Sequence, residues 1–187
     1  MQEPLHLQLE RVPSPLGEML IATDPAGRLR ILDWKDHEDD MRRLLRLQYR
    51  GRSVQLHESD TVSHATQAMQ AYFSGDLTAL DDIKVATGGT DFQREVWAVL
   101  RTIPAGRTIS YLELAMRIGR PAAVRAVGLA NGANPISVVV PCHRVIGSNA
   151  TLTGYGGGLS RKRWLLEHEN ALPPDLSQAA TARLPGF

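Results

Sequence analysis

The chain has 187 residues, of which 43% are hydrophobic and 22% are charged, and its formal net charge is +1. These values are ordinary for a soluble globular protein with one core or two small ones. No apolar stretch approaches the ~20 residues that span a bilayer, and the first residues lack the pattern of a signal peptide. The single cysteine excludes an intrachain disulfide. We therefore expect a cytoplasmic protein without a membrane partner.

The two halves of the chain differ in charge. Residues 1–90 carry 10 Lys and Arg against 14 Asp and Glu, a net of −4, whereas residues 91–187 carry 11 against 6, a net of +5. This difference favours two modules with different partners, and a positive carboxyl-terminal half suits contact with an anionic polymer. An accidental partition of charge is the alternative.

The first part of the chain has the pattern of a small α/β module. Turn-forming residues separate three short apolar segments, and two later segments carry apolar residues at helical spacing. The expected strands cover residues 5–12, 16–23 and 28–34, and the expected helices cover residues 38–49 and 61–73. These elements carry no recognisable catalytic pattern. We assign residues 1–88 to an amino-terminal α/β domain.

A second domain is expected over residues 89–170, with an irregular tail over 171–187. Its first helix starts at Thr90 or Asp91 and ends before the turn-forming sequence at 104–106. Ser110 and Glu113 then fit a capping box, in which the serine caps a backbone amide and the glutamate reaches back. This box predicts a helix over residues 111–118.

Gly119 ends that helix, and Pro121 begins another that reaches about Asn131. Two helices joined by a short turn are typical of a helix-turn-helix, whose second helix usually contacts DNA. A plain pair of packed helices is about equally consistent with the pattern.

The second helix of this pair has an unusual composition. Its small residues are Ala122, Ala123, Ala126, Gly128, Ala130 and Gly132. Arg125 is its only long charged side chain, so few groups are available to recognise base edges. A slim helix suits the minor groove, which is ~6 Å wide, and a single arginine can replace a displaced base. We predict DNA binding without strong sequence preference.

The lone cysteine lies in Pro141-Cys142-His143-Arg144-Val145, after an apolar run that we predict to be a strand. Basic neighbours favour the nucleophilic thiolate over the thiol. A nucleophilic thiol also needs a base and a group that orients the base. His143 and Glu169 are the best candidates for these roles. A buried cysteine without chemistry is the alternative.

The sequence around Cys142 resembles the active-site motif of the O6-alkylguanine-DNA alkyltransferases, also called methylated-DNA–protein-cysteine methyltransferases. The resemblance extends from about residue 92 to residue 169 and is loose in the amino-terminal part. It includes, in family order, Ser110-Tyr111, Arg125 to Gly128, Asn134-Pro135, Tyr155 to Gly157 and Leu165 to Glu169. The resemblance implies an α+β fold, with a ribonuclease-H-like α/β module followed by a mostly helical, winged-helix-like helix-turn-helix domain.

The resemblance also implies DNA repair by direct damage reversal. The target guanine is flipped out of the duplex, and the alkyl group moves from its O6 atom to Cys142. The thioether is permanent, so this suicide enzyme acts once per molecule, and O4-alkylthymine is a second expected substrate. The implied partner is double-stranded DNA bound through the minor groove by a monomer.

The family's site residues can be carried onto matching positions of this chain. The implied catalytic residues are Cys142, His143, Glu169, Asn134 and Tyr111. The implied DNA-binding residues are Arg125, Ala123, Ala126, Gly128 and Tyr111. The implied pocket residues are Val145, Tyr155, Gly156 and Gly157, within a Gly-rich loop expected to be a lid or a pocket wall.

Each catalytic group has an implied role. His143 acts through a water as the general base, and Glu169 orients it. Asn134 supports the active-site turn, Tyr111 donates to N3 of the leaving guanine, and Arg125 fills the vacated stack. The backbone near the Gly-rich loop binds the edge of the guanine.

The chain departs from the family pattern in two places. Some relatives bind structural zinc through amino-terminal cysteines, which this chain lacks, so we expect neither a metal nor another cofactor. Gly156 stands where some relatives have serine, which leaves more room for large alkyl groups. Two other classes of protein stay open from the residues alone, namely a helix-turn-helix regulator and a cysteine hydrolase that uses Cys142, His143 and Glu169.

Overall fold

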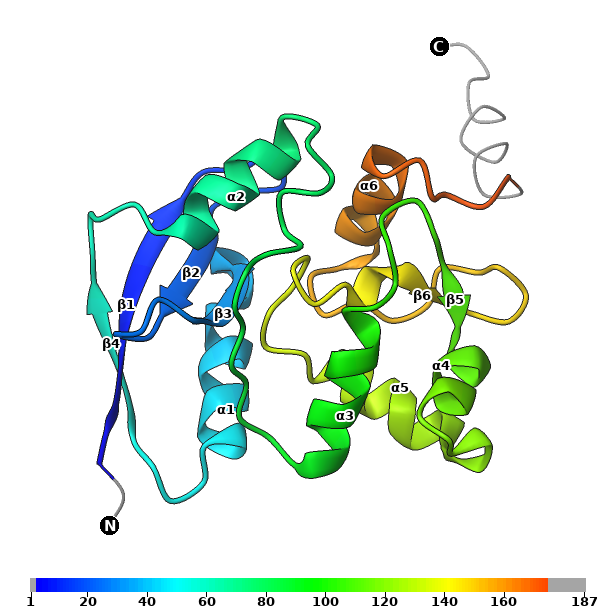
Figure 1. Cartoon of the computed structure of the whole chain (residues 1–187), viewed down its shortest axis with the longest axis horizontal. Helices are drawn as coiled ribbons and strands as arrows, with labels where there is room; N and C mark the ends of the chain where they lie inside the picture. Colours follow the sequence, from blue (N-terminus) through cyan, green and yellow to red (C-terminus); the bar gives the residue numbers. More distant parts are fainter. Residues whose placement is uncertain (1–2, 175–187) are drawn as a thin grey trace.

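The computed structural model describes residues 3–174 and has the expected mixed α+β fold (Figure 1). Within these residues, no helix is both long and apolar enough to cross a membrane. The expected tail begins at residue 171, where residues 171–173 form no helix or strand, and residues 175–187 lie outside the described part.

A four-stranded sheet occupies the amino-terminal part of the chain, with the strand order β3-β2-β1-β4. The strands are β1 (Leu5–Val12), β2 (Met19–Thr23), β3 (Leu29–Trp34) and β4 (Val54–Glu58). The three expected strands are confirmed, and β2 pairs antiparallel with both β1 and β3. The edge strand β4, parallel to β1, was not predicted. Val54 and Leu56 are its only apolar residues, so its hydrophobic signal is weak.

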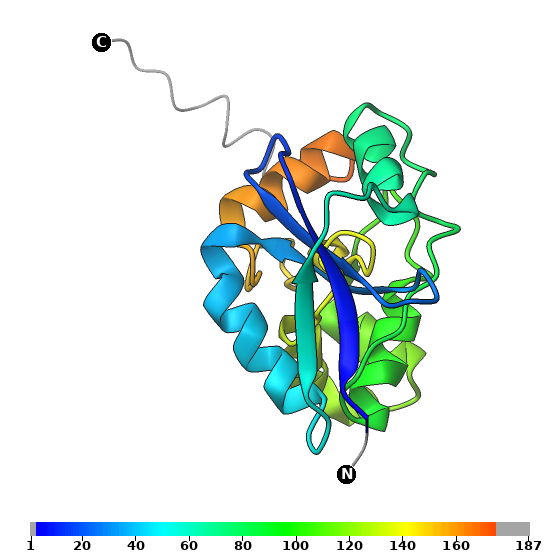
Figure 2. The ribbon, with the colours of Figure 1, turned by 90° about the vertical axis from the view of Figure 1, so that its left-hand side faces the viewer.

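Alternating side chains of the sheet face two different layers, as the two-residue period of a strand requires. Leu20 and Ala22 of β2 pack in a small cluster that includes Met41 and Leu45 of α1 (Glu38–Gln48). Residues of opposite parity, such as Ile21, join a larger cluster with the carboxyl-terminal helices. Figure 2 shows β1 and β4 nearest the viewer, with α1 to one side of them.

The second helix of this part, α2 (His64–Phe73), starts three residues later than expected. Its amino-terminal cap is Ser63, whose hydroxyl accepts a hydrogen bond from the backbone N–H of Thr66 at 3.2 Å. The buried Tyr72 lies near its end and belongs to the larger cluster.

The carboxyl-terminal part contains the expected pair of helices and a third helix against which they pack. These elements are α3 (Asp91–Leu100), α4 (Tyr111–Arg117) and α5 (Val124–Gly132), with the 3₁₀ turn η2 (Pro121–Ala123) before α5. Trp97 of α3 donates its indole N–H to the carbonyl of Ala130 at 2.8 Å. This bond fixes α5 against α3.

The predicted capping box at Ser110 is only half right. The Ser110 hydroxyl accepts from the N–H of Glu113 at 3.0 Å, but the Glu113 carboxylate binds Arg117 at 2.7 Å and does not reach back. An arginine one turn away is a stronger partner for a carboxylate than a neutral amide. The complete box is at α3, between Thr90 and Gln93.

The strand predicted before Cys142 is wrong. Residues 136–140 are all buried, but they form a turn in which the N–H of Val140 donates to the carbonyl of Ile136 at 3.0 Å. Val138 has φ 67°, a conformation that a strand excludes. Buried turns and buried strands can both consist of a short apolar run bounded by prolines. The sequence pattern alone therefore does not distinguish the two structures.

After this turn come the 3₁₀ turn η3 (Cys142–Arg144), β6 (Val145–Ile146) and α6 (Leu159–His168). β6 pairs parallel with β5 (Ile109–Ser110) beside the start of α4. One hydrophobic cluster runs through both parts of the chain and includes Trp34, Tyr72 and Leu165. The sheet and the carboxyl-terminal helices therefore share a core around the segment that carries Cys142.

Candidate active site

Cys142 is the first residue of η3 and lies in the wall of a cavity of about 420 Å³. The cavity is bounded by α1 and the end of β3 on one side and by α5 and the Gly-rich loop on the other. Cys142 as a residue is 5% exposed. A small molecule or a single base that enters this cavity can approach the thiol.

Asn134 holds the turn that presents Cys142. Its amide nitrogen donates to the carbonyl of Val140 at 2.7 Å and to that of Ile136 at 3.3 Å, and its oxygen accepts from the Ile136 N–H at 3.0 Å. The same nitrogen lies 3.1 Å from Sγ of Cys142. The buried amide therefore determines both the backbone path and the position of the sulfur.

The resting thiol is protonated, contrary to the expectation from its basic neighbours. Burial raises the pKa of Cys142 to about 11, although the Asn134 hydrogen bond and the charge of Lys162 act in the opposite direction. Arg144, which is adjacent in sequence, turns its guanidinium to Glu169 instead. In a buried site the cost of desolvating a thiolate exceeds the stabilisation from a distant cation.

Glu169 lies at the centre of a buried polar cluster. Its carboxylate accepts from Arg144 Nε and Nη2, both at 2.8 Å, and from the Tyr72 hydroxyl at 2.7 Å. His143 Nε2 lies 2.9 Å from the same carboxylate. Burial acts to raise the pKa of Glu169, but His143 and Arg144 outweigh it and lower the pKa well below its usual range. The carboxylate is therefore charged at neutral pH.

His143 is neutral in this arrangement, because burial lowers its pKa more strongly than Glu169 raises it. A carboxylate at Nε2 requires that nitrogen to carry the hydrogen, which leaves Nδ1 as an acceptor. Nδ1 is buried and has no hydrogen-bond partner among residues 3–174. The structure thus brings together His143 and Glu169, which the sequence analysis paired, and leaves one ring nitrogen available to accept a proton.

Lys162 is a site residue that the sequence analysis missed. Its side chain is completely buried, and Nζ donates to the carbonyls of Val145, Thr153 and Gly154 at 2.6, 2.8 and 3.4 Å. Burial lowers its pKa to about 8. Lys162 thereby ties the Gly-rich loop to β6. Lys162 precedes Leu165 and Leu166 by three and four residues, a spacing that places all three on the buried face of α6. This spacing could have predicted its burial, but the arginines on either side made the segment look like an exposed basic run.

The predicted pocket residues do not all line the cavity. Tyr155 and Gly156 do, together with Asp33 of β3 and Asn131 of α5, which the sequence analysis did not select. Val145 is buried outside the cavity, and its carbonyl already accepts from Lys162.

Gly157 contributes to the pocket by close packing. A Cβ atom there would lie 2.8 Å from both Trp34 and Tyr155, so only glycine fits without movement. The Tyr155 hydroxyl is buried and has no hydrogen-bond partner among the described residues. Tyr155 itself lines the cavity, so its side chain forms part of the wall beside Cys142.

Tyr111 lies at the start of α4, and its hydroxyl donates to the Thr153 carbonyl at 3.2 Å. It is not one of the residues around the cavity, but it lies beside Gly128 and Gly154, within 3.9 Å of where a Cβ atom would be at either glycine. Burial raises its pKa, which keeps the phenol protonated.

The predicted DNA-binding face of α5 is largely exposed. Arg125 and Ala126 are exposed, whereas Ala123 and Gly128 are half-buried. Leu129, which the sequence analysis did not select, is 71% exposed and lines the cavity together with Gly128. The exposed face of α5 thus leads directly into the cavity that contains Cys142.

No group of three or more His, Cys, Asp or Glu side chains within residues 3–174 is placed to hold a metal ion. The chemistry available at the site is that of the buried thiol, the His143 imidazole, the Glu169 carboxylate and the hydroxyls of Tyr72, Tyr111 and Tyr155.

Comparison with known proteins identifies relatives that match most of the chain. The family model described as the DNA binding domain of 6-O-methylguanine DNA methyltransferase matches residues 91–171. A methylated-DNA–protein-cysteine methyltransferase from Salmonella typhimurium is 49% identical over 168 residues, which cover 90% of this chain and 98% of the relative. The enzyme of that name from Mycobacterium tuberculosis is 57% identical over 112 residues, covering 60% of this chain and 67% of the relative.

A solved structure has the same architecture. The crystal structure of Mycobacterium tuberculosis OGT in complex with DNA is similar with a TM-score of 0.69 and 41% identity, covering 92% of this chain and 98% of that chain. The match extends beyond the carboxyl-terminal part to the sheet that the sequence resemblance covered only loosely. The chain belongs to the family of methylated-DNA–protein-cysteine methyltransferases.

Proposed function

We propose that this protein repairs DNA by moving the alkyl group of O6-alkylguanine in duplex DNA to Cys142, once per molecule. The observation that carries the proposal is the buried arrangement of Cys142, His143 and Glu169 beside a cavity that opens onto the face of α5. The names of the relatives and the DNA complex of one of them support the same activity.

The protein's own groups account for the proton transfers. Nδ1 of His143 takes the thiol proton through a water, and the Glu169 carboxylate stabilises the imidazolium that forms. Arg144 and Tyr72 keep that carboxylate in place by their hydrogen bonds. The thiolate forms a bond to the alkyl carbon while the bond from that carbon to O6 breaks.

The electron pair of the broken bond passes to the guanine, and N3 takes a proton from the Tyr111 hydroxyl. The proton that His143 accepted returns to Tyr111 through solvent, so the thiol proton ends on the guanine, which stays in the DNA as a neutral base. Tyr111 supplies the hydrogen bond at N3, since its raised pKa keeps the hydroxyl protonated. The Tyr155 hydroxyl, without a partner among the described residues, binds the edge of the base. The thioether has no leaving group, so each molecule acts once.

The resting state suits a thiol that is consumed. A protonated, buried Cys142 reacts slowly with oxidants and adventitious electrophiles, because the thiolate is the reactive form. A flipped guanine in the cavity replaces solvent and brings its alkyl carbon to the sulfur. The thiol is therefore activated when the substrate binds.

The helix-turn-helix supplies the DNA contact. The small residues of α5 let it enter the minor groove, and Arg125 fills the stack that the flipped base leaves. Flipping costs a few kcal/mol and is easiest for a poorly paired base, which supplies part of the selectivity for damage. We further propose that O4-alkylthymine is a second substrate and that the protein acts as a cytoplasmic monomer, with residues 89–170 as the DNA-binding domain.

The first prediction concerns transfer itself. After incubation with a duplex that carries O6-methylguanine, the peptide containing Cys142 gains about 14 Da, because a methyl group replaces the thiol hydrogen. At most one methyl group is transferred per protein molecule. Mass spectrometry measures the gain, and the Cys142→Ala variant is the control. An unmodified peptide beside intact lesion would contradict the proposal, and repeated turnover of small acyl substrates would favour a hydrolase.

The second prediction concerns the pH dependence of the thiol. Because the pKa of Cys142 is about 11, the rate of its alkylation by iodoacetamide rises with pH throughout the range from roughly pH 7 to 10, about tenfold per unit. The urea-unfolded chain, with an ordinary thiol pKa of about 8.5, provides the control and levels off near pH 9. A folded-state rate that already levels off below pH 8 would show that the resting group is a thiolate.

The third prediction tests Glu169. The Glu169→Gln variant slows transfer by about 10- to 100-fold, because a neutral amide stabilises the imidazolium of His143 less. Its affinity for unmodified duplex stays nearly the same. Glu167→Gln is the matched control, since it removes the same charge from the exposed side of α6 and should leave the rate of transfer nearly unchanged. Loss of DNA affinity in Glu169→Gln would make the residue structural instead.

The fourth prediction tests Arg125. Arg125→Ala slows transfer from duplex DNA by about tenfold or more, because the flipped state loses the group that replaces the base, while its reaction with free O6-benzylguanine slows far less. Arg117→Ala removes the same charge from α4, where Glu113 binds the guanidinium, and serves as the control. Single-turnover kinetics measure both reactions, and equal losses on both substrates would rule out the proposed role.

A further inference from the structure

The arginines on and just after α1 are distributed over two sides of the amino-terminal part. Arg42, Arg46 and Arg52 line a hollow between α1 and β4, away from Cys142. Arg43 instead lines the cavity that contains Cys142. Arg50 lines a neighbouring hollow, which is formed with the start of α3 and the end of α5. Arg43 and Arg50 therefore face the carboxyl-terminal part.

This side of α1 is held against the end of α5. The side-chain amide of Gln48 donates to the carbonyl of Ala133 at 2.8 Å, and the carbonyl of Gln48 accepts from the N–H of Gly89 at 3.0 Å. Leu44 and Ala133 line both of the hollows that face α5. The position of α1 relative to α5 is thus set by direct contacts.

The exposed face of α5 ends beside Arg43. Its exposed residues recur at a spacing of three or four, which places them along one side of the helix. They include Arg125, Leu129 and Gly132. The last two line the same cavity as Arg43. A duplex that lies along this face extends from Arg125 over the cavity mouth toward α1.

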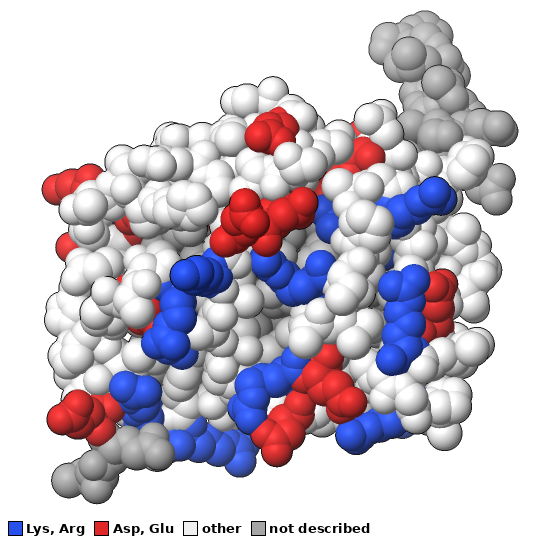
Figure 3. Space-filling model, in the orientation of Figure 1, with Lys and Arg blue, Asp and Glu red and all other residues white. Residues whose placement is uncertain are grey.

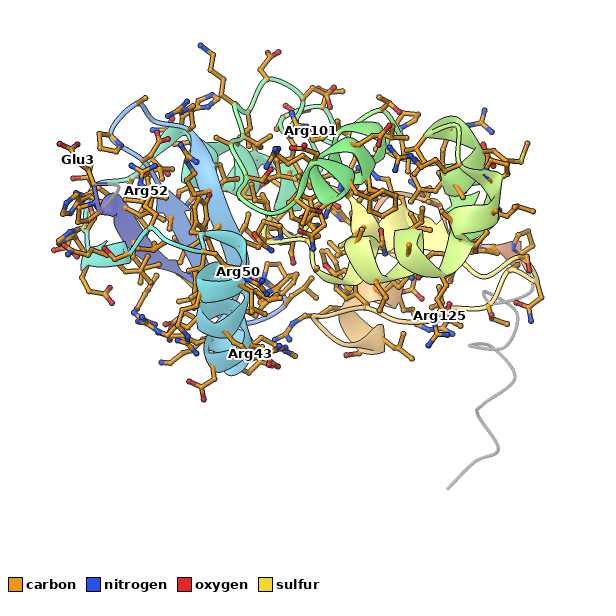
Figure 4. All side chains as sticks on the ribbon, turned by 90° about the horizontal axis from the view of Figure 1, so that it is seen from below. Glu3, Arg43, Arg50, Arg52, Arg101 and Arg125 are labelled. Carbon is orange, nitrogen blue, oxygen red and sulfur yellow. The ribbon has the colours of Figure 1, made fainter. Side chains whose placement is uncertain are left out.

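The guanidinium groups on this side are available for a further partner. Among the described residues Arg43 pairs only with Asp40, at 3.4 Å, and both side chains are more than half exposed, so the pair is weak. Arg50 is exposed and forms no ion pair within residues 3–174. Figure 4 shows Arg43 on α1, Arg50 just after it and Arg125 on α5, with Arg52 farther toward the sheet. By contrast, charges of both signs intermix over the face in Figure 3.

We propose that Arg43 and Arg50 bind backbone phosphates of the duplex that α5 engages, so that the sheet-bearing part of the protein also contacts DNA. Guanidinium groups match phosphate oxygens with two parallel hydrogen bonds. The proposal rests on the proposed function and extends its DNA surface beyond the helix-turn-helix. It concerns a local patch, because residues 1–90 as a whole carry a net charge of −4.

Salt dependence of binding tests the proposal directly. The full-length protein is titrated onto a labelled unmodified duplex at several salt concentrations, and the slope of log affinity against log salt is measured. Each lost phosphate contact lowers the slope by about 0.9, so the Arg43→Gln/Arg50→Gln variant loses up to about 1.8. The Arg46→Gln/Arg52→Gln variant removes the same charge from the opposite side, and its slope stays the same.

Asp40 offers a test in the opposite direction. The Asp40→Asn variant releases Arg43 from its ion pair and removes a negative charge at the cavity mouth, so DNA affinity increases. Asp60→Asn, near β4 and away from this side, is the matched control for net charge and leaves affinity nearly unchanged. Thermal unfolding of every variant establishes that it is folded before binding is compared.

The outcomes separate this proposal from the proposed function. If the wild-type protein binds the duplex and repairs O6-methylguanine, but both double variants have the same salt slope as the wild type, the arginine proposal is wrong and the repair function stands. Equal gains in affinity for Asp40→Asn and Asp60→Asn also contradict it. If the wild-type protein neither binds duplex DNA nor reacts with the lesion, the proposed function itself fails.

Discussion

The buried carboxylate of Glu169 is the constraint on which the arrangement of the site depends. A charged carboxylate without water is stable only when donors surround it, and here Arg144, His143 and Tyr72 supply them. These donors come from η3 and α2, and the acceptor follows α6. Removing one partner of such a buried ion pair destabilises the fold by about 3–5 kcal/mol. The cluster therefore holds three distant segments of the chain together, and the same contacts orient the imidazole of His143.

The same burial explains the state of the thiol. Cys142 lies behind a turn that the Asn134 amide holds, in surroundings that favour the neutral form. In the proposed function Cys142 is used once, and a site that stabilised the thiolate at rest would expose it to side reactions. In the proposed mechanism the cost of ionisation is instead offset when a base fills the cavity and His143 receives the proton. The burial of Cys142 thus both keeps the resting thiol protonated and makes its ionisation depend on a bound base.

The sequence predicted most elements of regular structure, because their periodicity and capping signals are local. It failed where a local pattern had two structural meanings. The mostly apolar residues 136–140 suit a buried turn as well as a strand, and the edge strand β4 has too few apolar residues to be noticed. Arg144 was expected to act on the neighbouring thiol, but a contact with Glu169, 25 residues away, directs it elsewhere.

The sequence alone determined the reactive residue types, their order and the family resemblance, since the motif around Cys142 and the small residues of α5 are contiguous in the chain. Only the tertiary structure decided which groups surround them. Tyr72 and Asp33 come from the amino-terminal part, and Lys162 is buried by its position on α6. Protonation states, cavity walls and the approach of α1 to α5 depend on burial and on long-range contacts, which no local pattern encodes.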